Sequence, residues 1–220
     1  MGSQTILDLI ASTVVFGSLL IMALRVNSSM VENMSAYRGD IVVQENLVEI
    51  TKLLEYDFRK IGYCKDPTKL SDPSLAIIYA DSIHIKFYTD LATGTSASEL
   101  QGDGNLDILD YYVGPTSEAM DTPNPNDRLL YRVENNGTPH GVNMGVTVFD
   151  IEYYDALKNK LSNPVSNPRL IQYLKITVQV EDFYKLGRVS TEFNTAAYDT
   201  VYQSAYWRQM RLEARNLRNR

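Results

Sequence analysis

The sequence predicts an α+β protein in which one long N-terminal helix packs on an antiparallel β-sheet. A continuous apolar run covers residues 6–26, and an amphipathic pattern of helical period follows as far as Gly62. Beyond Gly62 the apolar residues alternate with polar ones instead. A period near 3.6 is typical of helices, whereas a period of two is typical of half-buried strands. We therefore expect a helix up to Gly62 and a sheet domain over residues 63–220.

The apolar run near the N-terminus is long enough to cross a membrane. A helix rises 1.5 Å per residue, so about 20 residues span the hydrocarbon core of a bilayer. The run is apolar on every side, and such a helix needs a non-aqueous environment because it has no polar face to turn toward water. We expect residues 4–26 to form a transmembrane helix or part of the core of a filament.

Residues 27–62 are expected to form an amphipathic continuation of the same helix. Apolar residues recur there in steps of three and four, which places them on one face. They are Val43, Leu47, Ile50, Leu54, Phe58 and Ile61. We expect this face to pack on the sheet. Gly39 and Asp40 could bend the helix, because glycine is a poor residue in a helix interior, and Gly62 is expected to end it.

Short alternating segments between turn signals predict the strands of the sheet. In one of them Ile83, Ile85 and Phe87 alternate with polar residues, which places the three on one face. The predicted strands cover residues 82–88, 108–113, 128–133, 146–154 and 170–180, and sequences rich in Gly, Pro and Asn separate them. Val146, Val148, Ile151 and Tyr153 are the prominent apolar residues of the fourth. The pattern predicts an antiparallel sheet domain.

The composition excludes several classes of function. The chain has 220 residues, of which 21 are basic and 27 acidic, and this balance argues against a general nucleic-acid surface. A single cysteine, Cys64, excludes an internal disulfide, and together with only two histidines it is too sparse for a zinc site. The sequence contains no nucleophile elbow and no phosphate loop. We therefore predict that the protein is not an enzyme.

An acidic residue lies at the start of the apolar run. Asp8 could lie at the headgroup level of a membrane, but a carboxylate in hydrocarbon requires a partner or a function. Gly17 follows nine residues after Asp8 within the run. This spacing resembles the N-terminal signal of type IV pilins and type II secretion pseudopilins. The resemblance implies that a prepilin peptidase cuts between Ser3 and Gln4, that Gln4 becomes methylated, and that Asp8 and Gly17 serve assembly.

The sequence departs from the usual form of this signal. The acidic residue is usually Glu, the residue before the cut is usually Gly, and the first mature residue, here Gln4, is usually aromatic. The leader would consist of residues 1–3, which is very short and contains no Lys or Arg. These departures mark the leader as atypical.

The end of the amphipathic segment makes the resemblance more specific. Asp57, Arg59, Gly62 and Tyr63 form an Asp-x-Arg-x-x-Gly-Tyr run. A similar run ends the helix of J-type minor pseudopilins and W-type minor pilins, and the order of the later strand segments and the ending at residues 215–218 are also similar to theirs. The resemblance implies a pilin-like fold, an anchor in the bacterial inner membrane, and a sheet domain in the periplasm.

The resemblance also implies partners and a role. The partners are other pilin-like subunits, and the role is that of a minor subunit that helps to initiate or cap a type IV pilus or a type II secretion pseudopilus. In such a filament Asp8 is expected to pair with the free N-terminal amine of a neighbouring subunit. Two alternatives stay open: a major structural subunit of a pilin-like filament, and a single-pass protein with a periplasmic binding domain.

Three residues suggest a calcium site in the sheet domain. Asp103, Asn105 and Asp107 have oxygen-bearing side chains at alternate positions, as at the start of an EF-hand loop. The pattern then departs from that loop, because Ile108 stands at the position of the turn glycine and Gly114 at that of the bidentate Glu. A calcium site and a polar turn that opens a strand are both open interpretations. No other cofactor is expected.

The C-terminal end is rich in arginine. Met210, Leu212 and Ala214 alternate there with charged residues, which predicts a half-buried strand at an edge of the sheet. The arginines are Arg208, Arg211, Arg215, Arg218 and Arg220. A basic tail that holds nucleic-acid phosphates is the alternative. We favour the edge strand and expect no nucleic-acid partner.

Overall fold

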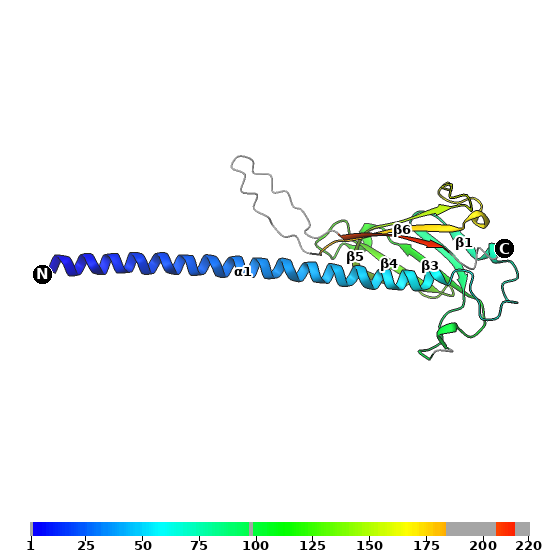
Figure 1. The fold of residues 1–220 in the computed structure, drawn as a ribbon, viewed down its shortest axis with the longest axis horizontal. Coiled ribbons are helices and arrows are strands. Elements are labelled where there is room, and N and C mark those ends of the chain that lie inside the picture. Colours follow the sequence, from blue (N-terminus) through cyan, green and yellow to red (C-terminus); the bar gives the residue numbers. More distant parts are fainter. Residues whose placement is uncertain (1, 97–98, 184–205, 214–220) are drawn as a thin grey trace.

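The computed structural model describes residues 2–96, 99–183 and 206–213. Its first element is α1, a single helix over Gly2–Arg59. At 1.5 Å per residue, its 58 residues extend about 87 Å. The first half of α1 projects away from the rest of the protein, and the second half lies along the sheet (Figure 1). An isolated helical segment is thus continuous with a helix-on-sheet domain.

The helix passes through Gly39 and Asp40 without a break, in contrast to the bend that glycine suggests there. A Cβ atom added at Gly39 would lie 2.2 Å from Oδ2 of Asp182. The absence of a side chain at Gly39 therefore allows the Asp182 carboxylate to approach the helix closely. Gly39 makes room for the contact between the helix and Asp182, and it does not interrupt the helix.

The helix ends at Arg59, shortly before the predicted end at Gly62. Gly62 has a φ of 70°, a left-handed conformation that glycine adopts without steric strain. Its N–H donates to the carbonyl oxygen of Tyr88 at 2.8 Å. The chain therefore turns at Gly62 and is held to the sheet where the helix stops.

The strands of the described residues form one antiparallel sheet in which each strand pairs with the next along the chain. They are β1 (Ile77–Ala80), β2 (His84–Thr89), β3 (Asp107–Val113), β4 (Arg128–Glu134), β5 (Gly141–Tyr154), β6 (Tyr173–Val180) and β7 (Tyr206–Glu213). Short 3-10 helices lie in the connections, namely η1 (Pro73–Leu75), η2 (Glu99–Gln101), η3 (Thr116–Ala119) and η4 (Pro168–Leu170). The predicted fold class, a long helix packed on an antiparallel sheet, is confirmed.

Strands β2 to β6 lie at the five predicted segments, but β1 has no clear sequence signal. β1 is only four residues long, and it is buried at its ends and exposed in its middle because its register with β2 shifts. In the neighbouring segment, Ile85 and Phe87 are fully buried as predicted. Ile83 lies just before β2 begins and is 37% exposed, so it is less buried than the other two residues of the predicted face.

A bulge in β5 determines which of its prominent apolar residues are buried. Val146 pairs with Val180 and Val148 with Gln179, so β5 has one extra residue between the two pairs. An extra residue in one strand changes the face to which the following side chains point. As a result Val146 and Ile151 are buried, whereas Val148 is exposed.

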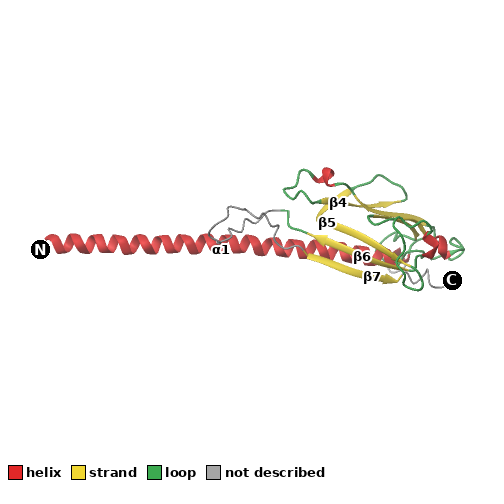
Figure 2. Cartoon of the chain, turned by 90° about the horizontal axis from the view of Figure 1, so that it is seen from above, coloured by secondary structure: helices red, strands yellow, loops and turns green. Residues whose placement is uncertain are grey.

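The second half of α1 covers one face of the sheet (Figure 2). The predicted apolar stripe faces the sheet: Val43, Ile50, Leu54, Phe58 and Ile61 are buried, and Leu47 is partly buried. Near the end of the stripe, the Phe58 ring makes edge-to-face contacts with Phe87 at 5.5 Å and with Tyr111 at 5.4 Å. Burying a side chain of this size contributes about 1.5–3 kcal/mol. Helix and sheet therefore share one core.

β7 forms one edge of the sheet and pairs with β6 along its whole length. The predicted edge strand is thus confirmed as far as Glu213. Arg208 within it is exposed. Ala214 and the terminal residues Arg215, Arg218 and Arg220 lie outside the described residues.

Candidate functional site

The first half of α1 exposes an extended apolar surface. Its large apolar side chains from Ile6 to Val26 are between 51% and 71% exposed. By length and composition, α1 is the helix of the described residues that is long and apolar enough to cross a membrane. Exposing so much apolar surface to water is unfavourable. This half of the helix is therefore suited to a bilayer or to packing among other helices.

The hydroxyl side chains within the apolar run bond to the helix itself. Ser12 donates to the carbonyl oxygen of Leu9 at 2.9 Å, and Ser18 donates to that of Val15 at 2.8 Å. Thr13 likewise donates to carbonyl oxygens of the preceding turn. Because these polar groups have partners within the helix, they are compatible with an apolar environment.

The four residues of the predicted processing and assembly signal lie on this exposed segment. Ser3 and Gln4 are in the first turn of α1, and Asp8 follows one turn later. The Asp8 side chain is exposed and makes no hydrogen bond or ion pair with the described residues. A Cβ atom at Gly17 would meet no atom within 4 Å. Cleavage, methylation and a role in assembly stay predictions.

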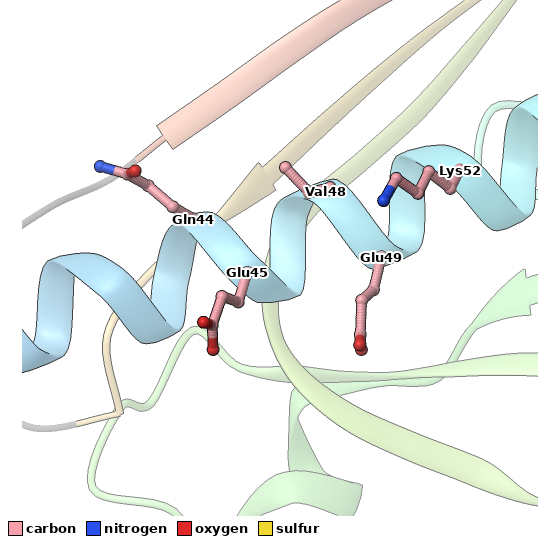
Figure 3. Close-up of a pocket in the computed structure, with 5 residues that line it drawn as sticks. All are labelled: Gln44, Glu45, Val48, Glu49 and Lys52. Carbon is pink, nitrogen blue, oxygen red and sulfur yellow. The ribbon is translucent and has the colours of Figure 1, made fainter.

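The outer side of the second half of α1 carries a shallow hollow lined by charged, polar and apolar side chains (Figure 3). Its lining residues are Gln44, Glu45, Val48, Glu49 and Lys52. Glu45 and Glu49 project in the same direction from successive turns. Neither they nor Lys52 forms an ion pair with the described residues. We call these five residues the outer helix surface.

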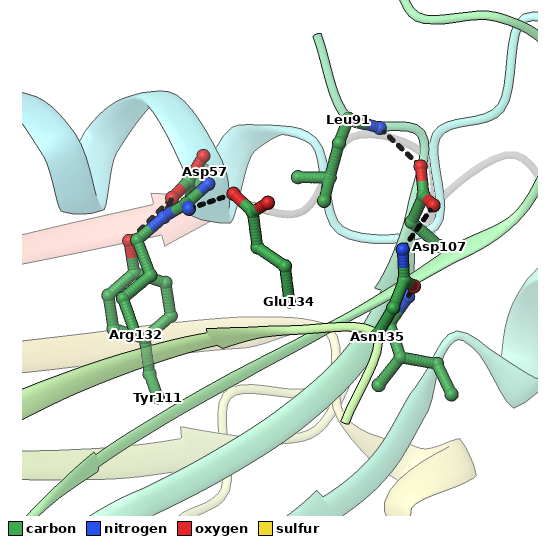
Figure 4. A network of polar contacts seen from close by, with 8 residues as sticks. Asp57, Leu91, Asp107, Tyr111, Arg132, Glu134 and Asn135 are labelled. Atoms are coloured by element: carbon green, nitrogen blue, oxygen red, sulfur yellow. Dashed lines mark hydrogen bonds and ion pairs between the residues drawn. The ribbon is translucent and has the colours of Figure 1, made fainter. Parts of the chain in front are cut away.

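A buried carboxylate joins the end of α1 to the sheet (Figure 4). Asp57 is only 1% exposed, and its Oδ2 accepts hydrogen bonds from Tyr111 Oη at 2.5 Å and Arg132 Nε at 2.7 Å. Arg132 also pairs with Glu134. Burial, together with the negative charge of Asp57, raises the pKa of the Tyr111 hydroxyl far above its usual range. These contacts fix the orientation of the helix on β3 and β4.

Sequence reasoning identified Asp57 in a motif but missed this role. A signal was present, because Asp57 lies three residues after Leu54 and seven after Ile50, on the apolar face of the helix. An acidic residue at such a position is buried and needs a partner. The identity of the partner, Arg132, depends on the pairing of distant strands and has no local signal.

The residues of the predicted calcium site take part in separate sets of hydrogen bonds. Asp107 accepts from the N–H of Leu91 at 2.9 Å and from Asn135 Nδ2 at 2.8 Å (Figure 4). Asp103 accepts from the N–H of Asn105 at 2.8 Å and from its Nδ2 at 3.0 Å. Within the described ranges, no group of three or more His, Cys, Asp or Glu residues is arranged to hold a metal ion. Calcium binding by Asp103, Asn105 and Asp107 stays a prediction.

The loop that contains these residues is built around Asp90, which sequence reasoning also missed. Asp90 is fully buried and accepts hydrogen bonds at 3.0 Å from the backbone N–H groups of Lys65, Asp103 and Gly104. Backbone N–H groups that converge in this way form a site for an anionic group. Gly102 has a φ of 92°, and a Cβ atom there would lie 1.7 Å from Asp90 Oδ1. The glycine is therefore needed for the loop to close on Asp90.

The fold defines an α+β protein with one long N-terminal helix, apolar in its first half and packed on an antiparallel sheet in its second. No family model matches the chain, and no curated protein matches it. Among solved structures it is similar to a type IV-like pilin from Thermus thermophilus, with 10% sequence identity and a TM-score of 0.42. The match covers 79% of this chain and 97% of that one.

Proposed function

We propose that the protein is a minor pilin or pseudopilin of the J/W type, which helps to initiate or cap a type IV pilus or a type II secretion pseudopilus. The observation that carries this proposal is α1: its apolar, exposed first half is continuous with a second half that the sheet holds firmly. The first half lies in the inner membrane before assembly and then packs among the helices of other subunits. Because the helix is unbroken, its movement carries the sheet domain from the periplasmic surface into the filament.

Asp8 gives this assembly a defined register. A carboxylate among apolar helices is stabilised only by a paired positive charge. Cleavage between Ser3 and Gln4 creates a new N-terminal amine, and Asp8 pairs with that amine on a neighbouring subunit. The absence of any contact of Asp8 with the described residues supports a partner on another chain.

The partners are other pilin-like subunits, and the role is structural, without catalysis or nucleic-acid binding. Contacts between the domains involve the outer helix surface and the sheet edges formed by β1 and β7. We expect a stable complex with two or three other pilin-like chains.

Membrane association tests the anchor. A charged side chain at the centre of a transmembrane helix costs about 2.5–3.5 kcal/mol. Leu20→Asp should therefore move the protein from the membrane fraction toward the soluble fraction. The matched control is Met34→Asp, because Met34 is similarly exposed on α1 but lies beyond the apolar run. Equal membrane association of Leu20→Asp and wild type would exclude the anchor.

Copy number separates the minor role from its alternatives. Quantitative mass spectrometry of sheared filaments should find a few copies of this chain per filament. If this chain is the most abundant subunit, or assembles filaments by itself, it is a major subunit. If it stays in the membrane and never enters filaments, it is a single-pass periplasmic protein.

A further inference from the structure

A carboxylate in the loop before β4 is buried and receives no hydrogen bond from the described residues. Asp127 is fully buried, and neither of its carboxylate oxygens has a hydrogen-bond partner among the described residues. An ionised carboxylate in this situation is very unfavourable unless another group compensates its charge. Since no described residue fully compensates the charge, a proton or a bound cation is the remaining way to neutralise Asp127 within the described part of the chain.

The surroundings of Asp127 are rich in oxygen atoms and carry further negative charge. Asn124, in the same loop, donates through Nδ2 to Glu181 Oε2 at 3.0 Å and to the carbonyl oxygen of Asp182 at 3.4 Å. The other carboxylate oxygen of Glu181 accepts from Gln179 Nε2 at 2.8 Å. Neither Asp127 nor Glu181 forms an ion pair with a Lys, Arg or His of the described residues.

Neutral neighbours compensate the charge of Asp127 only in part. Burial raises the pKa of Asp127, and the negative charges of Glu181 and Asp182 raise it further. Thr122 and Asn143 lie beside the carboxylate and act in the opposite direction. However, neither makes a hydrogen bond of acceptable geometry with it, and the Thr122 hydroxyl donates to two backbone carbonyl oxygens.

The cluster lies where α1 leaves the sheet domain. The Asp182 carboxylate contacts the helix at Gly39, at the position where a Cβ atom would otherwise stand. The described side chains of α1 before Gly39 are almost all exposed, and burial begins from Gly39 onward. Three segments therefore meet at this point: the loop before β4, the end of β6, and the helix.

We propose that this cluster binds a calcium ion, with the Asp127 carboxylate as its central ligand and Glu181 as the second acidic contributor. Calcium takes six to eight oxygen ligands from carboxylates, amides, carbonyls and water, and it tolerates irregular geometry. No set of three acidic, His or Cys ligands is preformed in the described part of the chain, so the remaining ligands are neutral oxygens and water. The ion neutralises Asp127 and holds the loop and β6 together beside the helix.

Thermal unfolding of the full-length protein in detergent micelles tests the site. Melting temperatures are compared in EGTA, in CaCl2 and in MgCl2 for the wild type, Asp127→Asn and Asp103→Asn. Asp103→Asn is the matched control, because it removes an acidic residue of the loop that the sequence suggested for calcium. Calcium at a hundredfold excess over its Kd should raise the melting temperature of wild type and Asp103→Asn by about 5 °C or more. Asp127→Asn should not respond, and magnesium should have a smaller effect.

The other outcomes overturn the proposal. If millimolar calcium leaves the wild type unchanged and Asp127→Asn is equally stable in EGTA, Asp127 is neutralised by a proton. If only Asp103→Asn loses the response, calcium binds the loop around Asp103. A response kept in both variants shows an ion bound elsewhere. Should Asp127→Asn fail to fold, Glu181→Gln replaces it, and calorimetry should show calcium affinity reduced at least tenfold. The test requires no filament, so its result is independent of the proposed function.

Discussion

The Nε atom of Arg132 on β4 lies 2.7 Å from the Oδ2 atom of Asp57 on α1. Asp57 is almost completely buried, whereas the Arg132 side chain is 26% exposed. Removing one member of such a pair leaves the other charge without compensation in a poorly solvated place. The contact therefore fixes α1 to the sheet at the end of the helix farthest from the apolar run.

Loss of the Asp57 carboxylate should weaken the domain strongly. We expect Asp57→Ala to lower the free energy of unfolding by about 3 kcal/mol, because the buried Tyr111 hydroxyl loses its acceptor and Arg132 keeps only its pair with Glu134. Urea denaturation of the full-length protein in micelles measures this value. Arg59→Ala, an exposed change close by on the same helix, should alter it by less than about 0.5 kcal/mol. Similar effects of the two changes would contradict the structural role of Asp57.

Replacement of Asp8 should separate membrane insertion from assembly. Asp8→Ala removes a charge from an apolar segment, so membrane association should be unchanged or improved. Its incorporation into filaments should fall, because the partner amine loses its counter-charge. Asp8→Glu should assemble almost normally, and Ser12→Ala serves as a control within the same run. Undiminished incorporation of Asp8→Ala, measured as the ratio of filament to membrane protein, would refute the role of Asp8.

The N-terminus of the native protein should begin at Gln4. Mass spectrometry of protein purified from membranes and filaments should find a peptide that starts at Gln4 and is heavier by one methyl group. Ser3→Gly introduces the residue usual before the cut and should increase the cleaved fraction. Native protein that still begins with Met1 would exclude this processing.

At low pH the folded protein should lose stability, in part because Glu152 becomes protonated. Hydrogen bonds from Lys160 at 2.5 Å and Lys175 at 2.7 Å lower the pKa of Glu152 to about 2. Since this value is below that of an unfolded Glu, about 4.3, the contribution to stability is complete above about pH 5 and is lost as the pH falls toward about 2. Glu152→Gln should lower the melting temperature at pH 7 and flatten its decline below pH 5.

The control for Glu152 is Glu49→Gln, because Glu49 is exposed and makes no ion pair with the described residues. The pH dependence of this variant should match that of the wild type. High salt should reduce the Glu152 effect, since Lys160 is 58% exposed and its charge is screened. A Glu152→Gln curve parallel to the wild type from pH 2 to 7 would disprove the assignment.

Gly102 should tolerate no side chain. Gly102→Ala combines an unfavourable positive φ with a clash at Asp90, and we expect a loss of about 2 kcal/mol or more in the free energy of unfolding. Gly104→Ala is the matched control, because its φ is 87° but its Cβ would meet Asp66 only at an ordinary 3.6 Å. Its loss should be about 1 kcal/mol, from the conformation alone. Equal losses would show that the contact with Asp90 is unimportant.

Most of the fold follows from local patterns. The helical stripe ending at Phe58 and the alternation around Ile85 predict both elements and the faces that they bury. The pattern does not show that Val148 is exposed, because a bulge shifts the face of the later residues without any change in composition. It also misplaced the end of the helix, since a bond between Gly62 and a neighbouring strand determines where the chain turns.

Some features of the candidate site could be predicted from the sequence, and others depend on the tertiary structure. The apolar run with Asp8 and Gly17 can be recognised in the sequence, because its hydrophobicity and spacing depend only on residues that are close together in the chain. The sequence by itself thus determined the long helix with its apolar first half and the antiparallel class of the sheet. Only the tertiary structure decided which carboxylates are buried and what meets them: Asp57 meets Arg132, Asp90 meets backbone N–H groups, and Asp127 has no donor among the described residues. Burial and pairing arise from contacts between segments far apart in sequence, and no local period records them.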